Sequence, residues 1–145
     1  MKISKSWLER RCACADGVKW YSGYARTDTT DGLEVITALM AEDKFDWANW
    51  LIVRLMEKKQ YVAYAVYSAE QVVDIFESKY PNDNRPRLAI EAAKAVLAGD
   101  SAATRAAARA AADAATRAAD AAAYAARESI QKKIISYGLK LLEKK

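Results

Sequence analysis

The sequence predicts an all-α protein: a single-domain bundle of several helices packed around one long, alanine-rich helix. Residues 100–127 hold seventeen alanines in 28 positions, with neither glycine nor proline, and alanine is the strongest helix former. The whole chain has only five glycines and two prolines, which favours helices with short connections over sheets with many turns. Elsewhere, large apolar residues recur at spacings of three and four, as in amphipathic helices.

The first quarter of the chain predicts two short helices followed by a polar loop. The first helix begins at an N-cap, either Ser4 or Ser6, and ends near residues 14–17, where an Asp-Gly pair is a turn signal. A short helix through residues 18–21 follows. The polar run over residues 26–32 predicts a loop that can cap the next helix.

The middle of the chain predicts three more helices. Residues 31–41 are amphipathic, whereas residues 44–58 are apolar nearly all round, which is typical of a helix buried on several sides. The tryptophans of this second helix, Trp47 and Trp50, are therefore expected in the core rather than on a binding surface. A third helix covers residues 60–79.

The second half begins with the clearest loop, residues 80–86. Asn84 is the expected N-cap of a helix that runs to about residue 98, with Pro86 in its first turn. The alanine-rich helix over residues 100–127 then extends about 42 Å and is the expected centre of the bundle. Its small side chains allow close helix packing, so leucine at Ala114 or Ala118 is expected to cost about 1–3 kcal/mol.

Residues 129–143 form an amphipathic C-terminal segment, whose expected buried stripe is Ile130, Ile134, Tyr137 and Leu141. Counted around the helix, the large apolar residues Ile130, Ile134, Leu141 and Leu142 lie on the side where the alanine-rich helix carries its polar residues. We therefore expect the chain to break, bend or change neighbours near residues 127–130. A homodimer is the lesser alternative to a monomer.

Composition limits the classes of function. The 145 residues carry a net charge of +4 and 52% hydrophobic residues, enough for one domain with its own core. We expect no membrane span, because charges interrupt every apolar run, and no signal peptide, because no apolar segment follows Met1. Two cysteines, Cys12 and Cys14, are too few for a disulfide framework. With no histidine, a metal site is not expected, nor is a cofactor. The expected location is the cytoplasm.

Catalytic patterns are scarce. The chain has no glycine-rich phosphate loop and no histidine for a nucleophile–base pair. Only acidic pairs remain, Asp43 with Asp46 and Glu70 with Asp74, at spacings that also occur in helix caps and exposed ion pairs. We therefore predict a non-enzyme, with an acid-based hydrolase as the minor alternative.

Two arginines beside Pro86 allow two interpretations. Arg85 and Arg87 would form a fork for a carboxylate or phosphate of a ligand. Alternatively, they clamp carboxylates of the preceding helix, namely Glu70, Asp74 or Glu77. The structural interpretation is favoured, because loop arginines near acidic helix ends usually pair locally.

Three stretches, ISKSWLERRCACADGVKWY at 3–21, DKFDWANWLIVRLM at 43–56 and YPNDNRPRLAIEAAKA at 80–95, together with the alanine-rich helix, resemble an immunity-protein family. Its members are all-helical and alanine-rich, and they occur near polymorphic-toxin loci and in phage genomes. The resemblance implies a cytoplasmic, non-catalytic protein that binds and neutralises a cognate toxin, as in toxin–antitoxin pairs. The candidate partner-binding residues are Asp46, Asp83, Arg85, Arg87, Arg105 and Arg109.

The alternative is a phage-encoded regulator, an anti-defence or host-takeover factor that binds a host protein or nucleic acid. The basic residues that favour nucleic acid are Arg105, Arg109, Arg117 and the lysines near the C-terminus. Cations near a helix C-terminus also suit the helix dipole, so a protein partner is preferred over nucleic acid.

Overall fold

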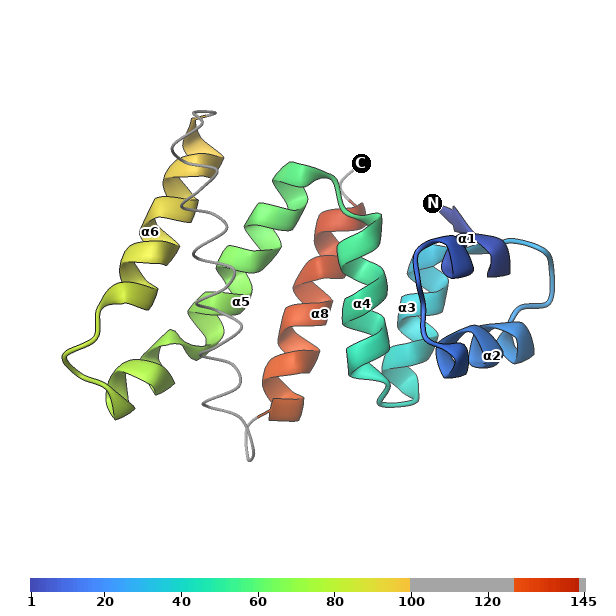
Figure 1. Ribbon diagram of the computed structural model, residues 1–145, viewed down its shortest axis with the longest axis horizontal. Helices are drawn as coiled ribbons and strands as arrows, with labels where there is room; N and C mark the ends of the chain where they lie inside the picture. The colour runs from blue at the N-terminus through green and yellow to red at the C-terminus, as the bar shows by residue number, and fades with distance from the viewer. Residues whose placement is uncertain (100–126, 144–145) are drawn as a thin grey trace. The chain divides into compact units, whose positions relative to one another are not determined.

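The computed structural model describes residues 1–99 and 127–143. This part of the chain contains seven helices and one pair of two-residue strands (Figure 1). The predicted all-α class is therefore confirmed. The elements group into two compact units, Met1–Leu55 and Met56–Lys145, which are described in turn. One domain over residues 1–145 stays a prediction.

Unit 1 holds four helices and both strands. The helices are α1 (Lys5–Arg10), α2 (Ala15–Tyr24), α3 (Gly32–Ala41) and α4 (Phe45–Leu55). Strand β1 (Lys2–Ile3) pairs antiparallel with β2 (Thr30–Asp31), in the register Lys2 opposite Asp31 and Ile3 opposite Thr30. The strand pair was not predicted, because two residues are too short to show an alternating pattern.

Two helix starts in unit 1 follow the sequence expectation. The Ser4 side chain accepts a hydrogen bond from the backbone N–H of Trp7 at 3.1 Å, so Ser4 is the N-cap of α1. The carboxylate of Asp31 accepts from the backbone N–H of Leu33 at 3.0 Å and caps α3 at the end of the predicted polar loop. Both caps satisfy N–H groups that the first helical turn leaves without a partner.

The predicted end of the first helix is wrong. Helix α1 already ends at Arg10, because Cys12 adopts a φ of 58°, in the left-handed region that stops a helix. Cys14 then caps α2 by accepting the Gly17 N–H at Sγ, 3.4 Å away. The Asp16-Gly17 pair therefore lies in the first turn of α2 instead of forming a turn of its own.

The core of unit 1 lies between α3, α4 and the strand pair, and several side chains of α2 join that helix to them. Buried Tyr21 donates its hydroxyl hydrogen bond to the Ile3 carbonyl at 2.9 Å and thereby ties α2 to β1. The largest fully buried side chains of this unit are isoleucines, Ile3, Ile36 and Ile52. Phe45, Ala48, Leu51 and Leu55 complete the buried side of α4.

Unit 2 holds three described helices, α5 (Lys58–Lys79), α6 (Arg85–Ala98) and α8 (Arg127–Glu143). Helix α5 packs against both α6 and α8 and lies between them (Figure 1). Its start is a capping box, in which Glu57 and Gln60 each bond the backbone of the other. The core between α5 and α6 consists of Val66, Ala69, Val73, Ile90 and Ala93.

The buried face of α8 differs from the predicted stripe. The buried residues are Ile135, Gly138 and Leu142. Leu142 was expected on the apolar side, whereas the four residues of the predicted stripe are only half-buried. The face is centred on Gly138, whose lack of a side chain allows close approach of a neighbouring helix. Tyr137 instead flanks this face and stacks on Tyr67, with ring centroids 4.1 Å apart. A count of large apolar side chains around a helix gives a glycine no weight, so it did not predict that Gly138 is buried.

Several expectations concern residues outside the described ones. These are the alanine-rich helix over 100–127 up to residue 126, the candidate residues Arg105 and Arg109, and the substitutions at Ala114 and Ala118. None of the helices in the described ranges is both long enough and apolar enough to cross a membrane.

Candidate functional site

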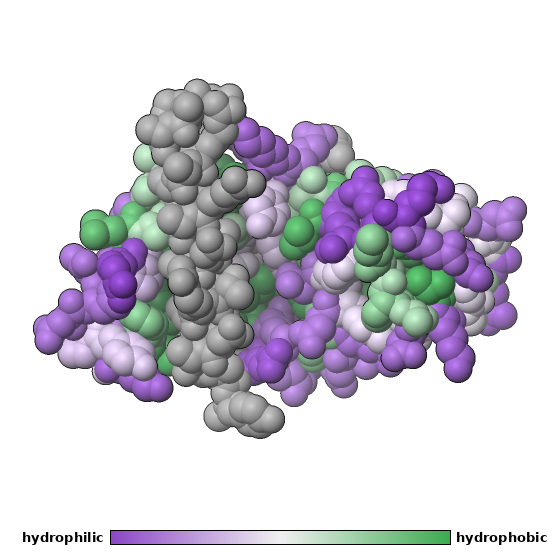
Figure 2. All heavy atoms as spheres, in the orientation of Figure 1, coloured by the Kyte–Doolittle hydropathy of each residue, from purple (hydrophilic) through white to green (hydrophobic). Residues whose placement is uncertain are grey.

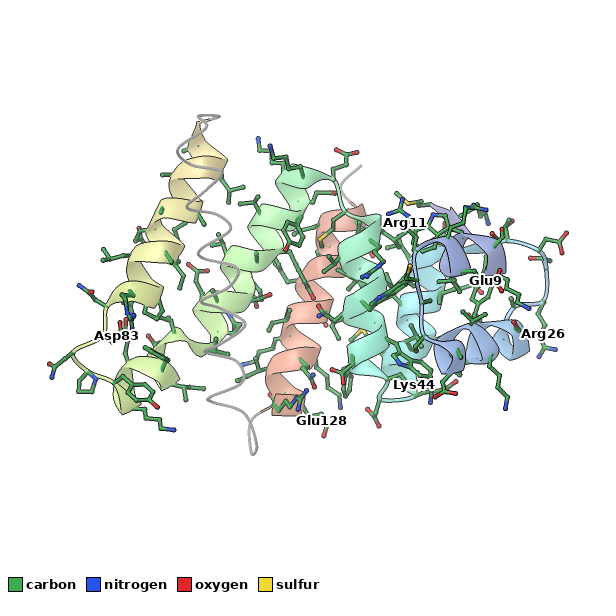
Figure 3. The ribbon with its side chains drawn as sticks, in the orientation of Figure 1. Glu9, Arg11, Arg26, Lys44, Asp83 and Glu128 are labelled. Carbon is green, nitrogen blue, oxygen red and sulfur yellow. The ribbon has the colours of Figure 1, made fainter. Side chains whose placement is uncertain are left out.

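The turn between α5 and α6 gathers three of the predicted site residues in one short segment. Helix α5 ends before Tyr80 because Pro81 disfavours a helical conformation in the residue that precedes it. The backbone N–H of Asp83 donates to the Tyr80 carbonyl at 3.0 Å and closes the turn. Asn84 takes the predicted N-cap position of α6 without a capping hydrogen bond from its side chain, and Pro86 lies in the first turn of that helix. Figure 3 labels Asp83 at this turn.

A bidentate ion pair between Arg85 and Asp83 stabilises the turn. The guanidinium of Arg85 donates from Nε to Oδ1 of Asp83 at 2.8 Å and from Nη2 to Oδ2 at 2.6 Å. The backbone N–H of Arg85 adds a third hydrogen bond to the same carboxylate at 3.2 Å. Because these donors stabilise the ionised form, they lower the pKa of Asp83 to about 2. The side chain of Arg85 is 86% exposed and faces solvent from a fixed position.

Arg87 joins the two helices. Its Nε and Nη2 donate to the two carboxylate oxygens of Glu77 at 2.7 and 2.6 Å, and Nη2 also donates to Asp74 at 3.0 Å. These hydrogen bonds hold the pKa of Glu77 below its ordinary value. The clamp on the preceding helix is therefore confirmed for Arg87, whereas Glu70 pairs with Lys94 at 2.9 Å.

Two exposed hydrophobic side chains flank these charges. Tyr80 is 44% exposed and Leu88, one helical turn after Arg85, is 60% exposed. Lys79 lies over the Tyr80 ring, with Nζ 5.5 Å from the centroid. We call Tyr80, Asp83, Arg85 and Leu88 the turn surface. Figure 2 shows mostly hydrophilic residues around this end of α5 and α6, so the turn surface mixes charge with two exposed apolar groups.

The remaining described site residue, Asp46, belongs to unit 1. It lines an apolar pocket of about 310 Å³, together with Trp20, Trp47 and Trp50. Trp47 and Trp50 are half-buried, so the expectation that they are core residues is wrong. Helix α4 packs against α3, and its buried residues are Phe45, Ala48, Leu51, Ile52 and Leu55.

Sequence reasoning missed three of these residues. Tyr80 and Leu88 flank the loop that contains the prolines. A signal was available for Tyr80, because the residue before a proline usually ends a helix, where its side chain can be exposed. No local signal pointed to Trp20, which meets Trp47 edge to face with centroids 6.5 Å apart, because this contact depends on the packing of α2 near α4. Among the described residues, no group of three Cys, Asp or Glu side chains could hold a metal ion.

Comparison with known families identifies the chain. Residues 52–133, more than half of the sequence, match the family model described as Imm-5 like putative immunity protein. The chain belongs to this family. The match takes in α5, α6 and the turn surface of this Imm-5 like protein, and Asp46 lies outside it. No curated protein and no solved structure matches the chain. Family membership supports an immunity-like role and, with it, a protein partner.

Proposed function

We propose that this Imm-5 like protein is a non-catalytic inhibitor that binds a toxin protein in the cytoplasm and neutralises it, using the turn surface as the contact. The observation that carries the proposal is the turn itself. It lies within the family match and presents an exposed arginine, tyrosine and leucine from a segment that two sets of ion pairs hold in place.

The residue types support a protein interface. Tyrosine and arginine are over-represented among the residues that dominate binding energies, and such residues cluster in small patches. Arg85 is already held by Asp83, and Arg87 fixes the start of α6 on α5. A partner therefore meets side chains that lose little conformational freedom on binding, which lowers the entropic cost of association.

The carboxylates support a non-catalytic role. Glu70 is bound to Lys94, and Asp74 to Arg87, both at the surface. This acidic pair serves helix packing by ion pairs. The net charge of +4 favours a partner with an acidic surface, because complementary charge raises association rates.

The test begins with the genome neighbourhood and then measures binding. A toxin gene beside this one supplies the probe: the two proteins are co-expressed, co-purified and titrated by calorimetry. Tyr80→Ala and Arg85→Ala are each expected to weaken the complex by about 30-fold, the value for a residue central to an interface. Tyr61→Ala is the matched control, since Tyr61 is 40% exposed and lies in the first turn of α5, at the opposite end of that helix from the turn surface.

The outcomes separate the function from the surface. A toxin that neither co-purifies with the protein nor loses toxicity when the protein is co-expressed contradicts the immunity function. If the toxin binds tightly but the Tyr80→Ala and Arg85→Ala variants have the same affinity as the Tyr61→Ala control, only the assignment of the contact to the turn surface is contradicted. An isolated phage early gene with a host-protein partner would favour the regulator alternative.

A further inference from the structure

The pocket of unit 1 has the composition of a small-molecule site. Its volume of about 310 Å³ is at the small end of the range for ligand pockets, and mostly apolar walls with a few polar groups are typical of such sites. Three of the four tryptophans of the chain, Trp20, Trp47 and Trp50, line it. Because each is half-buried, the indole rings are accessible to a ligand and are also held by packing.

The charge of the pocket selects the ligand. Asp46 is the single charged residue among those that line it. Asp46 is an exposed residue, so its charge is accessible from solvent. This carboxylate would repel an anion that enters the pocket. A cation would be attracted both by the carboxylate and by the electron-rich faces of the indoles.

The rings of this pocket already bind cations within the chain. Arg54 lies over Trp50, with Cζ 3.7 Å from the ring centroid, and donates to the Trp50 carbonyl at 3.1 Å. Lys44, labelled in Figure 3, lies over Trp47 at 5.7 Å and is bound to Glu42 at 3.0 Å. Neither cation lines the pocket. Both show that the indole faces of this unit are positioned for cation–π contacts.

We propose that this pocket binds a small organic ammonium ion with an apolar body. The apolar body fills the space between the tryptophans, and the ammonium group lies over an indole ring near the Asp46 carboxylate. Every residue that lines the pocket, from Leu8 to Leu51, lies outside the family match, and the proposal does not depend on the immunity function.

Three soluble probes test the proposal on the full chain. Benzyltrimethylammonium carries both the charge and an aromatic body, choline carries the charge with a smaller body, and 3,3-dimethyl-1-butanol is the uncharged isostere of choline. We expect saturable one-to-one binding by calorimetry in the order benzyltrimethylammonium, choline, alcohol, with the charge worth at least about 3-fold between the last two. Tryptophan fluorescence should change with the same midpoint.

Variants locate the site. Asp46→Asn is expected to weaken benzyltrimethylammonium binding by about 3-fold, the effect of one exposed charge pair. Asp28→Asn makes the same change at an exposed position that does not line the pocket and should leave affinity unchanged. Trp47→Leu is expected to weaken binding by about 10-fold. Its circular dichroism is recorded alongside, and Asp46→Asn keeps the test decisive if Trp47→Leu fails to fold.

Two results would overturn the proposal. One is the absence of saturable benzyltrimethylammonium binding up to about 10 mM, where even a weak specific site would fill. The other is equal affinity for choline and its uncharged isostere, together with an Asp46→Asn effect no larger than that of Asp28→Asn. A second readout comes from Cys12 and Cys14, which line the same pocket: bound ligand should slow their alkylation by iodoacetamide.

Discussion

Gly32, the first residue of α3, is the position where one methyl group is expected to matter most. A Cβ added there would lie 2.6 Å from Cδ1 of Leu55 and 3.2 Å from the carbonyl oxygen of Met1. Leu55 is only 3% exposed, so its side chain has little room to move. The Met1 carbonyl also accepts the Gly32 N–H at 2.8 Å, which holds the backbone close. Gly32→Ala therefore overpacks the core.

The magnitude follows from two opposing effects. Overpacking costs about 1–3 kcal/mol, and alanine recovers up to about 1 kcal/mol of helix propensity, less at the first helical position. We expect a net loss of about 1–2 kcal/mol in the free energy of unfolding. Gly23→Ala is the matched control, because in the described structure a Cβ at Gly23 meets no atom within 4 Å. It should stabilise by about 0.5 kcal/mol.

Urea unfolding followed by tryptophan fluorescence is the assay, because all four tryptophans lie in unit 1. With a slope of about 1–2 kcal/mol per molar urea, the midpoint should fall by about 1 M for Gly32→Ala and rise slightly for Gly23→Ala. In a Leu55→Val background, which lacks Cδ1, the cost of Gly32→Ala should shrink. Equal or greater stability of the Gly32→Ala protein would refute the packing argument.

Three further predictions concern single contacts. The carboxyl of Asp83 should titrate at about 2 by NMR and return toward its ordinary value of 3.8 in Arg85→Ala. Since the folded pKa is the lower one, the stability from this pair is present above the ordinary pKa and is lost as pH falls toward 2. Alanine at Tyr67 and Tyr137 should give a coupling energy of about 0.5–1.5 kcal/mol in a double-mutant cycle, and zero coupling would contradict the stacking. Ser4→Ala should cost about 1 kcal/mol in urea unfolding through loss of the cap; an unchanged midpoint would place the cap elsewhere.

The part of the candidate site that sequence reasoning found is its local part. Asp83, Arg85 and Arg87 lie within five residues around Pro86, so any fold that keeps the turn keeps them together. Tyr80 and Leu88 were missed because the exposure of an apolar side chain depends on whether another element packs over it. Helix propensity and residue spacing do not show which elements pack there.

The sequence by itself determined the helices and most of their starts. Ser4 and Asp31 cap α1 and α3 because a cap needs only the backbone of the next turn. Asn84 takes the N-cap position of α6. The all-α class follows from the same local effects, summed over a chain rich in alanine and poor in glycine and proline.

Tertiary structure alone decided which faces are buried. The two-residue strand pair forms because Ile3 pairs with Thr30, although helices α1 and α2 separate them in the sequence. The tryptophans of α4 line a pocket together with Trp20 of α2, which contacts Trp47. On α8 the buried residues are Ile135, Gly138 and Leu142, whereas the equally apolar Ile130, Ile134 and Leu141 are only half-buried. In each case the outcome depends on a residue distant in the chain, because burial is a property of two surfaces and a periodic pattern describes only one of them.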